Sequence, residues 1–527
     1  MIQRFVALLV PSVLAACATT PWLEQVEPAT NYATDSVGKA VPFAAGRAEA
    51  ALMAQAARYH MELQGDGRLA TLADAVLDHL ARKDAMPPPE QIDAMARRMG
   101  ITDELSFMGF WNAEALEAGA ARMFEGLPSN IRYNRFGIAK FQSGHSFAFG
   151  VILSVRLVQL QPVPRHVPVG TAVHIAGHLL PPGKTAFGFV TPPSGAARSM
   201  GRMSGGDFAF TLRPSAPGVY RVEVMADAGE GPRIAAILPI YADMGESAAL
   251  PASPTATQAA RLPANAPNEA IVARILELLN QARTTAGAAP LTLDPALNQL
   301  ARGHAQDMVD HAFFAHVSPT HGDPARRAAV AHLPVQWTGE NIALAQTAEQ
   351  ADQGLMASPG HRMNLLNPLH NRVGIGVVRG KAEHGSLYVA VEFGYALPPP
   401  ETARTIVLEV LNQARAQNGQ APLTWEPGWS EALQALASQC IGQNPVSMGV
   451  LAAQLKVLAL QPPLPAGFQV QSWPVIGLLQ VPPSVPRLGA GMRQIGMAFG
   501  MGEADAARGT AAYVLILVAP EGSESKP

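Results

Sequence analysis

Three short motifs between Phe313 and Phe393 decide the fold: Phe314-Ala-His316-Val-Ser318-Pro319, Gly339-Glu340-Asn341-Ile342 and Ser358-Pro359-Gly360-His361-Arg362. Two imidazoles and a carboxylate recur in these motifs, whereas most of the remaining chain is aliphatic, Ala-rich and Pro-rich. We therefore expect the side chains of His316, Glu340 and His361 to converge in one cleft.

The third motif predicts a helix that begins next to one of the histidines. Ser358 followed by Pro359 is a helix start, because the serine hydroxyl caps free N–H groups and proline fits the first turn. His361 then lies in that first turn. There the positive end of the helix dipole lowers the pKa of an imidazole and favours the neutral form, which binds metal ions.

These residue types allow several interpretations. With His316, His361 and Glu340 as ligands, zinc or another divalent metal would keep one position for water, as in catalytic zinc sites. Glu340 could instead orient an imidazole. Alternatively, the three side chains only hold loops together by hydrogen bonds, since the sequence lacks His-Glu-x-x-His and clustered Cys/His patterns. A nucleophilic triad of Ser358, His361 and Glu340 is conceivable, but Ser358 is better explained as a helix cap.

An internal repeat extends outward from this stretch. Leu276-Glu-Leu-Leu-Asn-Gln-Ala-Arg283 returns as Leu408-Glu-Val-Leu-Asn-Gln-Ala-Arg415, and Pro290-Leu-Thr292 returns at the same displacement as Pro422-Leu-Thr424. Agreement at this density predicts two domains of one fold in tandem, at residues 268–397 and 402–520. Because no histidine follows His384 in the sequence, the second domain cannot build the cleft.

The chain before this repeat shows two other patterns. Helical periodicity and two strands across residues 44–154 predict a third, more diverged copy, which lacks a Gly-Glu-Asn motif. Short β-prone runs between Pro and Gly turns predict an immunoglobulin-like β-sandwich over residues 155–245. Residues 246–267 are a Pro/Ala/Ser/Thr linker, and residues 521–527 are a tail.

Taken together with Leu279-Asn280-x-x-Arg283 and Val373-Gly-Ile-Gly376, the three motifs closely resemble the CAP superfamily. This group holds cysteine-rich secretory proteins, plant pathogenesis-related proteins and bacterial extracellular SCP-like proteins. The resemblance implies an α+β fold, an α/β/α sandwich with a central antiparallel sheet. It also implies a cleft with two histidines and two acidic residues, in some members around a divalent metal. His316 and His361 match the histidines and Glu340 matches one acidic residue, whereas Ser358 stands at the second acidic position.

The other histidines of this domain have structural interpretations. His304 belongs on an apolar helix face as a satisfied core histidine. We expect the rest to be surface or loop residues: His311, His321, His332, His370 and His384.

The first residues predict export and lipid attachment. Residues 1–16 carry one basic residue and an apolar run, as signal peptides do. Leu14-Ala15-Ala16-Cys17 resembles a bacterial lipobox, which implies cleavage before Cys17 and a diacylglycerol on its sulfur; alternatively, this is an ordinary secretory signal. Residues 17–43 would be a tether to a membrane, the outer membrane by family analogy. Cys440 then has no partner, so we expect no intrachain disulfide.

Composition narrows the function further. The net charge is −3, from 38 basic and 41 acidic residues, so we do not expect nucleic acid as a partner. The sequence predicts a lipid-anchored cell-envelope protein that faces the periplasm or the exterior. Its cleft would bind an unknown lipid, glycan, peptide or divalent metal in a non-catalytic binding or scaffold role. The alternative is a metal-assisted hydrolase, acting on peptides, cell wall or lipids, with Glu340 as base.

Overall fold

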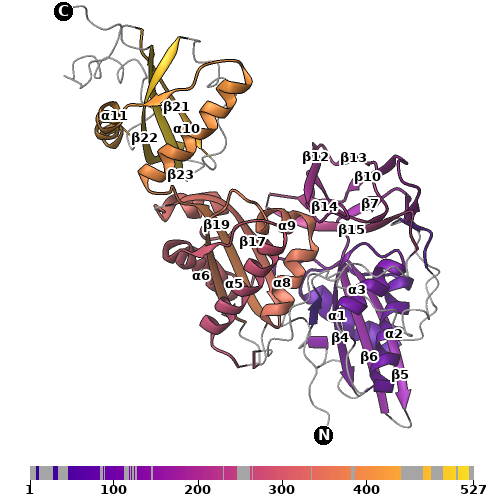
Figure 1. Cartoon of the computed structure of the whole chain (residues 1–527). Helices are drawn as coiled ribbons and strands as arrows, with labels where there is room; N and C mark the ends of the chain where they lie inside the picture. Colours follow the sequence, from indigo (N-terminus) through magenta and orange to yellow (C-terminus); the bar gives the residue numbers. More distant parts are fainter. Residues whose placement is uncertain are drawn as a thin grey trace, which may run out of the picture.

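The structure is a computed structural model (Figure 1), and it describes residues 8–10, 28–33, 46–83, 87, 89–111, 118, 120–121, 124, 127–143, 146–229, 231–245, 262–263, 265–333, 335–380, 386–440, 467–475, 491–505 and 509–520. Cys17, His384, most of the predicted linker and the predicted tail lie outside these residues. No helix in the described ranges is both long and apolar enough to cross a membrane.

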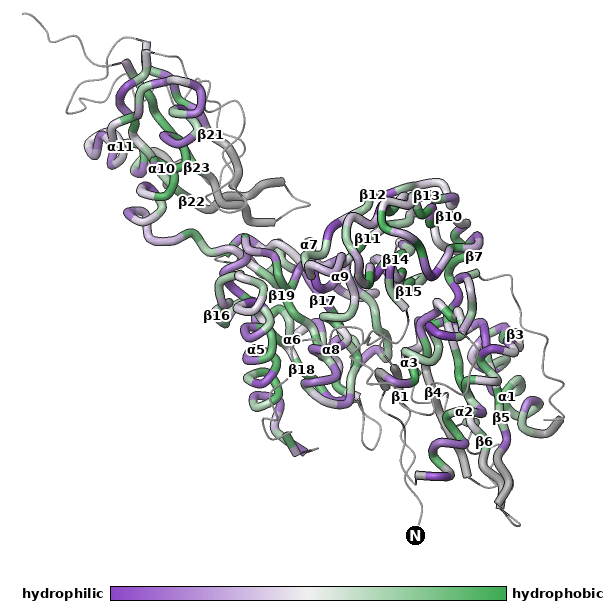
Figure 2. The backbone as a smooth tube through the Cα atoms, turned by 45° about the vertical axis from the view of Figure 1, so that its right-hand side comes forward, coloured by the Kyte–Doolittle hydropathy of each residue, from purple (hydrophilic) through white to green (hydrophobic). Residues whose placement is uncertain are grey.

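The part of the chain that carries the three motifs is a three-layer α/β/α arrangement. Its elements are α5 (Asn268–Thr285), β16 (Thr292–Leu293), α6 (Pro295–Asp310), α7 (Pro324–Val330), β17 (Gln336–Ala345), α8 (Ala348–Ala357), α9 (Pro359–Leu365), β18 (Arg372–Arg379) and β19 (Leu387–Tyr395). The sheet has the order β16-β18-β19-β17. One face packs against α5 and α8, and the other packs against α6. Figure 2 shows hydrophobic residues along β19, every residue of which is buried.

Two glycines allow α6 to lie directly on this sheet. A Cβ atom added to Gly374 would lie 2.1 Å from the carbonyl carbon of Leu297, and one added to Gly376 would lie 2.2 Å from that of Ala301. Any side chain at either position would push α6 away from β18. The Val-Gly-Ile-Gly motif is therefore a packing requirement of the fold.

The N-terminal and C-terminal parts have the same strand order. The N-terminal elements are β1 (Leu8–Val10), α1 (Gly46–Arg58), β3 (Gln64–Gly65), α2 (Gly67–Lys83), α3 (Pro89–Arg98), β4 (Glu104–Trp111), β5 (Arg135–Ser143) and β6 (Ser146–Val155). The C-terminal elements are α10 (Pro400–Gln417), β20 (Thr424–Trp425), α11 (Pro427–Cys440), β21 (Gln469–Val475), β22 (Met492–Asp505) and β23 (Gly509–Pro520). The orders are β3-β5-β6-β4, with β1 added at the edge, and β20-β22-β23-β21. In all three sheets the first pair is parallel and the next two are antiparallel.

Matching residues of the sequence repeat make matching contacts. Asn280 donates to the carbonyl of Leu291 at 3.0 Å and accepts from its N–H at 2.7 Å, and Asn412 exchanges the same two bonds with Leu423 at 3.0 and 2.7 Å. A glycine also meets the covering helix in each part. An added Cβ at Gly137 would lie 2.0 Å from the Leu69 backbone in α2, and one at Gly496 would lie 2.7 Å from the Trp429 side chain in α11.

An all-β part lies between the first two sheets in sequence. Its strands are β7 (Val158–Leu160), β9 (His166–Val167), β10 (Val173–Leu179), β11 (Thr185–Thr191), β12 (Arg198–Ser204), β13 (Asp207–Leu212), β14 (Gly218–Asp227) and β15 (Pro232–Ala242). They form one sheet of order β13-β10-β7 and another of order β12-β11-β14-β15-β9. Both sheets contribute to a single apolar core. The immunoglobulin-like type stays a prediction.

Part of the predicted tether is packed instead of free. Residues Asn31–Tyr32 form β2, which pairs with β8 (Val163–Pro164). Tyr32 is fully buried in the core of the all-β part, and its hydroxyl donates to the carbonyl of Pro239 at 2.9 Å. The prediction that residues 17–43 form a free tether is therefore wrong at Tyr32. Within the predicted signal peptide, β1 pairs with β4.

The structure tests the interpretations of His304 and of four other histidines of this domain. His304 is buried, and its Nε2 lies 3.0 Å from the carbonyl oxygen of Ala315, as expected of a core histidine. His311, His321 and His332 are exposed. His370, predicted to be a surface or loop residue, is 2% exposed and stacks on Phe393 with ring centroids 4.9 Å apart. It lies in a loop, but the loop is covered.

Burial of His370 makes stability depend on pH. Burial, with the charge of Arg283, lowers the pKa of His370 from 6.5 to about 4. The unfolded chain therefore binds a proton that the folded chain excludes, and stability present above pH 6.5 is lost as the pH falls towards 4. In His370→Gln, the decrease in the free energy of unfolding on acidification should be smaller by about 3 kcal/mol. Hydrogen exchange of the β19 amides, corrected for intrinsic rates, measures this free energy. His332→Gln, at an exposed position, is the control; parallel curves for both variants would contradict the prediction.

Candidate functional site

The structure brings His316 and Glu340 into direct contact. His316 lies in the loop after α6, and Glu340 lies in β17. The Nδ1 atom of His316 is 2.8 Å from Oε1 of Glu340. Because Nδ1 is engaged, Nε2 is the ring nitrogen left for a ligand. Glu340 therefore orients this imidazole, one of the two roles that the sequence allowed.

Arg327 holds the other side of Glu340. Its Nη2 donates to Oε2 of Glu340, and its Nη1 donates to the carbonyls of His316 at 2.7 Å and Gly322 at 2.8 Å. Arg327 is on α7, so one guanidinium ties that helix, β17 and the His316 loop together. Arg327 could not be predicted from the sequence, because nothing in its local sequence separates it from a surface arginine.

A second carboxyl group lies beside Glu340 on the neighbouring strand. Glu392 in β19 is the direct cross-strand partner of Glu340, and both are buried. Burial raises the pKa of both carboxyls, and the adjacent Glu340 raises that of Glu392 further, to well above its ordinary value. We infer that Glu392 keeps its proton and donates it to Glu340, while Trp337 Nε1 donates to Glu392 Oε2 at 2.6 Å. A lone acidic residue in an apolar strand was the available signal.

His361 and its neighbours are fixed by the Gly-Glu-Asn motif and by the helix cap. Asn341 donates to the carbonyl of His361 at 3.0 Å and accepts from Asn364 at 2.9 Å. The Ser358 hydroxyl accepts from the backbone N–H of His361 at 3.3 Å, which confirms the predicted cap. This contact is to the backbone of His361, so the structure gives no support to a Ser358 nucleophile.

A carboxyl group from the all-β part reaches this helix start. Glu223 on β14 is fully buried, and its Oε2 accepts from the backbone N–H of Gly360 at 2.8 Å. Its Oε1 has no hydrogen-bond partner among the described residues, and burial raises the pKa of the Glu223 carboxyl to about 7. An acidic group thus lies next to Ser358, at the position where the resemblance leaves none. Sequence reasoning could not find it, because Glu223 lies far away in the chain.

Both candidate histidines are neutral in this environment. Burial, with the nearby charge of Arg327, lowers the pKa of His316 to about 4. Burial, with the neighbouring His316, lowers the pKa of His361 to about 3. Burial is therefore the largest cause of the neutral form at both histidines. Neutral imidazoles can accept a proton or donate a lone pair to a metal.

The residues present fit a metal ion only in part. His316 and His361 offer two imidazoles, but both oxygens of Glu340 are already engaged by His316 and Arg327. In the ranges that the structure describes, no group of three His, Cys, Asp or Glu side chains could hold a metal ion. The three-ligand zinc site stays a prediction, and this geometry does not supply its third ligand.

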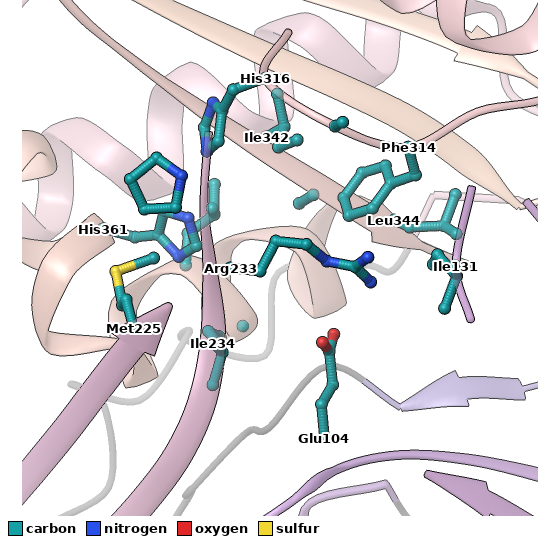
Figure 3. A pocket seen from close by; sticks show the side chains of 15 residues that line it. Glu104, Ile131, Met225, Arg233, Ile234, Phe314, His316, Ile342, Leu344 and His361 are labelled. Atoms are coloured by element: carbon teal, nitrogen blue, oxygen red, sulfur yellow. The ribbon is translucent and has the colours of Figure 1, made fainter. Parts of the chain in front are cut away.

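The two histidines line a pocket that three parts of the chain build together (Figure 3). The cavity itself measures about 90 Å³ and lies within a wider empty region of about 850 Å³ that includes open solvent. The N-terminal part contributes Glu104 and Ile131, and the all-β part contributes Met225 and Pro232 to Ile234. The remaining walls are mostly apolar residues of the motif-bearing part: Phe314, Ala315, Ile342, Ala343, Leu344, Gly354 and Leu355.

Contacts between these parts close the pocket around His316. The side chain of Asn130 donates to the carbonyl of Phe314 at 3.1 Å and accepts from its N–H at 2.8 Å. Gly231 lies so close that a Cβ atom there would be 2.7 Å from Cβ of His316. Its φ of 92° also favours glycine. The His316 loop is therefore held from one side and covered from another.

Replacing each buried glutamate separately tests which one is charged. Glu340→Gln removes the anion that balances Arg327, and we expect it to destabilise the chain by about 3 kcal/mol. Glu392→Gln keeps a neutral hydrogen-bond donor beside Glu340, so its cost should stay within about 1 kcal/mol. Urea unfolding followed by tryptophan fluorescence measures both. Equal losses, or a larger loss for Glu392→Gln, would contradict the inferred protonation.

Comparison with known proteins assigns the motif-bearing part of the chain to a family. The model of the cysteine-rich secretory protein family, CAP, matches residues 276–393. The uncharacterized protein YkwD of Bacillus subtilis (strain 168) is 39% identical over 116 residues, which are 22% of this chain and 44% of YkwD. The uncharacterized membrane protein YlbC of the same organism is 37% identical over 107 residues, 20% of this chain and 31% of YlbC.

The chain thus spans less than half the length of either relative. An extracellular protein from Bacillus anthracis that contains an SCP domain is 18% identical, covers 54% of this chain and 92% of its own, and has a TM-score of 0.22. The family resemblance of the three motifs is confirmed by the family match, and residues 276–393 of this chain are a domain of the CAP superfamily.

Proposed function

We propose that this chain is a secreted or cell-envelope binding protein whose CAP domain holds a small ligand. The observation that carries the proposal is the pocket beside His316 and His361, which three parts of the chain enclose. Pockets with apolar walls and a few convergent polar groups are typical of small-molecule sites. A lipid, glycan fragment or short peptide remains the class of ligand that the sequence predicted.

The cover over the pocket favours binding over polymer hydrolysis. A cell-wall strand or a protein substrate would need an open groove along the histidines. Here Gly231 of the all-β part contacts His316. Glu223 of the same part accepts a hydrogen bond from Gly360 at 2.8 Å, and Gly195 accepts one from Arg362 at 3.0 Å. These contacts would have to separate before a polymer could reach the imidazoles.

The other parts would then support the CAP domain without chemistry of their own. We propose that residues 44–154 and 402–520 are degenerate copies, on the strength of their shared strand order and matching glycine contacts. Residues 155–245 would be an immunoglobulin-like sandwich that covers the site. The C-terminal copy has no histidine, and so cannot repeat the site.

A neutral, polarity-sensitive dye tests the proposed binding. We expect N-phenyl-1-naphthylamine to bind the full chain at one saturable site with a rise in fluorescence. Ile234→Trp should abolish this rise, because Ile234 lines the pocket and the larger side chain would fill it. Val330→Trp is the matched control, since Val330 is 71% exposed and does not line the pocket.

A fluorescence rise that is absent in the wild type, or equal in both tryptophan variants, would contradict the binding proposal. Calorimetry with zinc tests the second candidate function, which the two neutral imidazoles favour. One-to-one zinc uptake that His316→Ala with His361→Ala abolishes would support a metal-assisted hydrolase. Without such uptake that function is excluded.

We also propose that Cys17 carries a lipid anchor and places the chain at the outer membrane. The support is the lipobox-like Leu14-Ala15-Ala16-Cys17. Several acyl chains hold a protein at a bilayer firmly, because each buried methylene contributes about 0.8 kcal/mol. Cys17→Ser should move the protein from the membrane fraction to the soluble fraction of cells, and unchanged partitioning would rule the anchor out.

A further inference from the structure

Arg233 is a cation in the pocket that the CAP motifs do not explain. It lies on β15 in the all-β part and lines the pocket together with both histidines. Figure 3 shows its side chain extending through the pocket, with the guanidinium group between Phe314 and Glu104. Within the described part of the chain, Arg233 forms no ion pair or hydrogen bond from its side chain.

Glu104 faces Arg233 but does not neutralise it fully. Its carboxylate points towards the guanidinium in Figure 3, and the two groups interact through their charges without direct pairing. Burial raises the pKa of Glu104, and the charge of Arg233 opposes part of that rise. A carboxyl whose charged form is disfavoured is a weak counterion. The guanidinium is thus available to a better one.

Among the described residues that line the pocket, Glu104 is the one carboxyl group and Arg233 is the one Lys or Arg side chain. Phe314, Ile342 and Leu344 make apolar walls on the CAP side. A guanidinium beside such walls is costly to keep without an anion, and its planar donors match a carboxylate in pairs.

Resting on the proposed binding function, we propose that the ligand is an amphipathic acid: an apolar body with one anionic group that Arg233 binds. The apolar body lies against Phe314, Ile342 and Leu344, and the anionic head group lies against the guanidinium of Arg233, which it takes over from Glu104. The residue that selects the ligand is therefore outside the CAP domain. Ligand choice comes from the all-β part, while the CAP domain supplies the walls and the imidazoles.

Three probes with one tail and different head groups test this assignment. Decanoate, decanol and decylamine are each used to displace N-phenyl-1-naphthylamine from the full chain at pH 7.5 and below their micelle concentrations. We expect decanoate to bind about 10-fold more tightly than decanol, as a charge-assisted pair in a partly buried site would provide. Decylamine should bind most weakly, because its ammonium meets the same cation.

Two substitutions at the head-group position sharpen the test. Arg233→Gln should bring decanoate down to the affinity of decanol and leave decanol unchanged. Glu104→Gln should strengthen decanoate binding, because it removes the competing negative charge. Arg302→Gln, an exposed arginine on α6, should leave all three affinities as in the wild type.

The outcomes separate this inference from the function it rests on. If the dye binds but decanoate and decanol bind equally, the Arg233 assignment is overturned and the binding function stands. Tightest binding by decylamine would likewise overturn it, since Glu104 would then be the selecting group. If the dye itself does not bind the wild type, the binding function fails first.

Discussion

The buried carboxylate of Glu340 is the interaction on which the site depends. One oxygen holds the His316 ring and the other binds Arg327, which also fixes two carbonyl groups of the loop between α6 and α7. A buried anion with this many donors is stable only while each of them is present. The neighbouring Glu392 adds one more donor by remaining protonated. The position of His316 is thus a property of β17, β19 and α7 together.

This arrangement also explains why Glu340 is a poor metal ligand here. A carboxylate that gave up Arg327 to bind zinc would leave a buried guanidinium without its counterion, which costs more than an isolated hydrogen bond. His316 and His361 would break no such ion pair if a ring nitrogen that does not contact Glu340 bound a ligand. The chemistry open to the pocket is therefore that of two neutral imidazoles in an apolar enclosure. That chemistry suits hydrogen bonding to a bound molecule.

Sequence reasoning succeeded where function follows from local pattern. The Ser358-Pro359 helix start and the pairing of two distant motifs, His316 with Glu340, could both be predicted from residue types and the family resemblance. It failed where a residue contacts the site from a distant position in the sequence. Glu392 has a role only because β17 and β19 pair in this register, and Glu223 only because β14 docks on α9. Arg327 has a role only because α7 packs against β17 and the His316 loop. The burial of His370 could not be predicted for the same reason, since a loop position does not reveal that Phe393 covers it.

The three sheets that share one strand order separate what the fold needs from what the site needs. The fold needs a glycine where a helix crosses the strand, and Gly137, Gly374 and Gly496 each meet that demand. It also needs side chains that bind the backbone, as Asn280 and Asn412 do. The site needs residues on loops and strand faces that contribute nothing to these contacts. A sheet of this order therefore keeps its core without histidines, and the C-terminal part has this strand order and no histidine. The pocket could then be completed by a different element, and the β14–β15 hairpin, with Gly231 against His316, occupies that place.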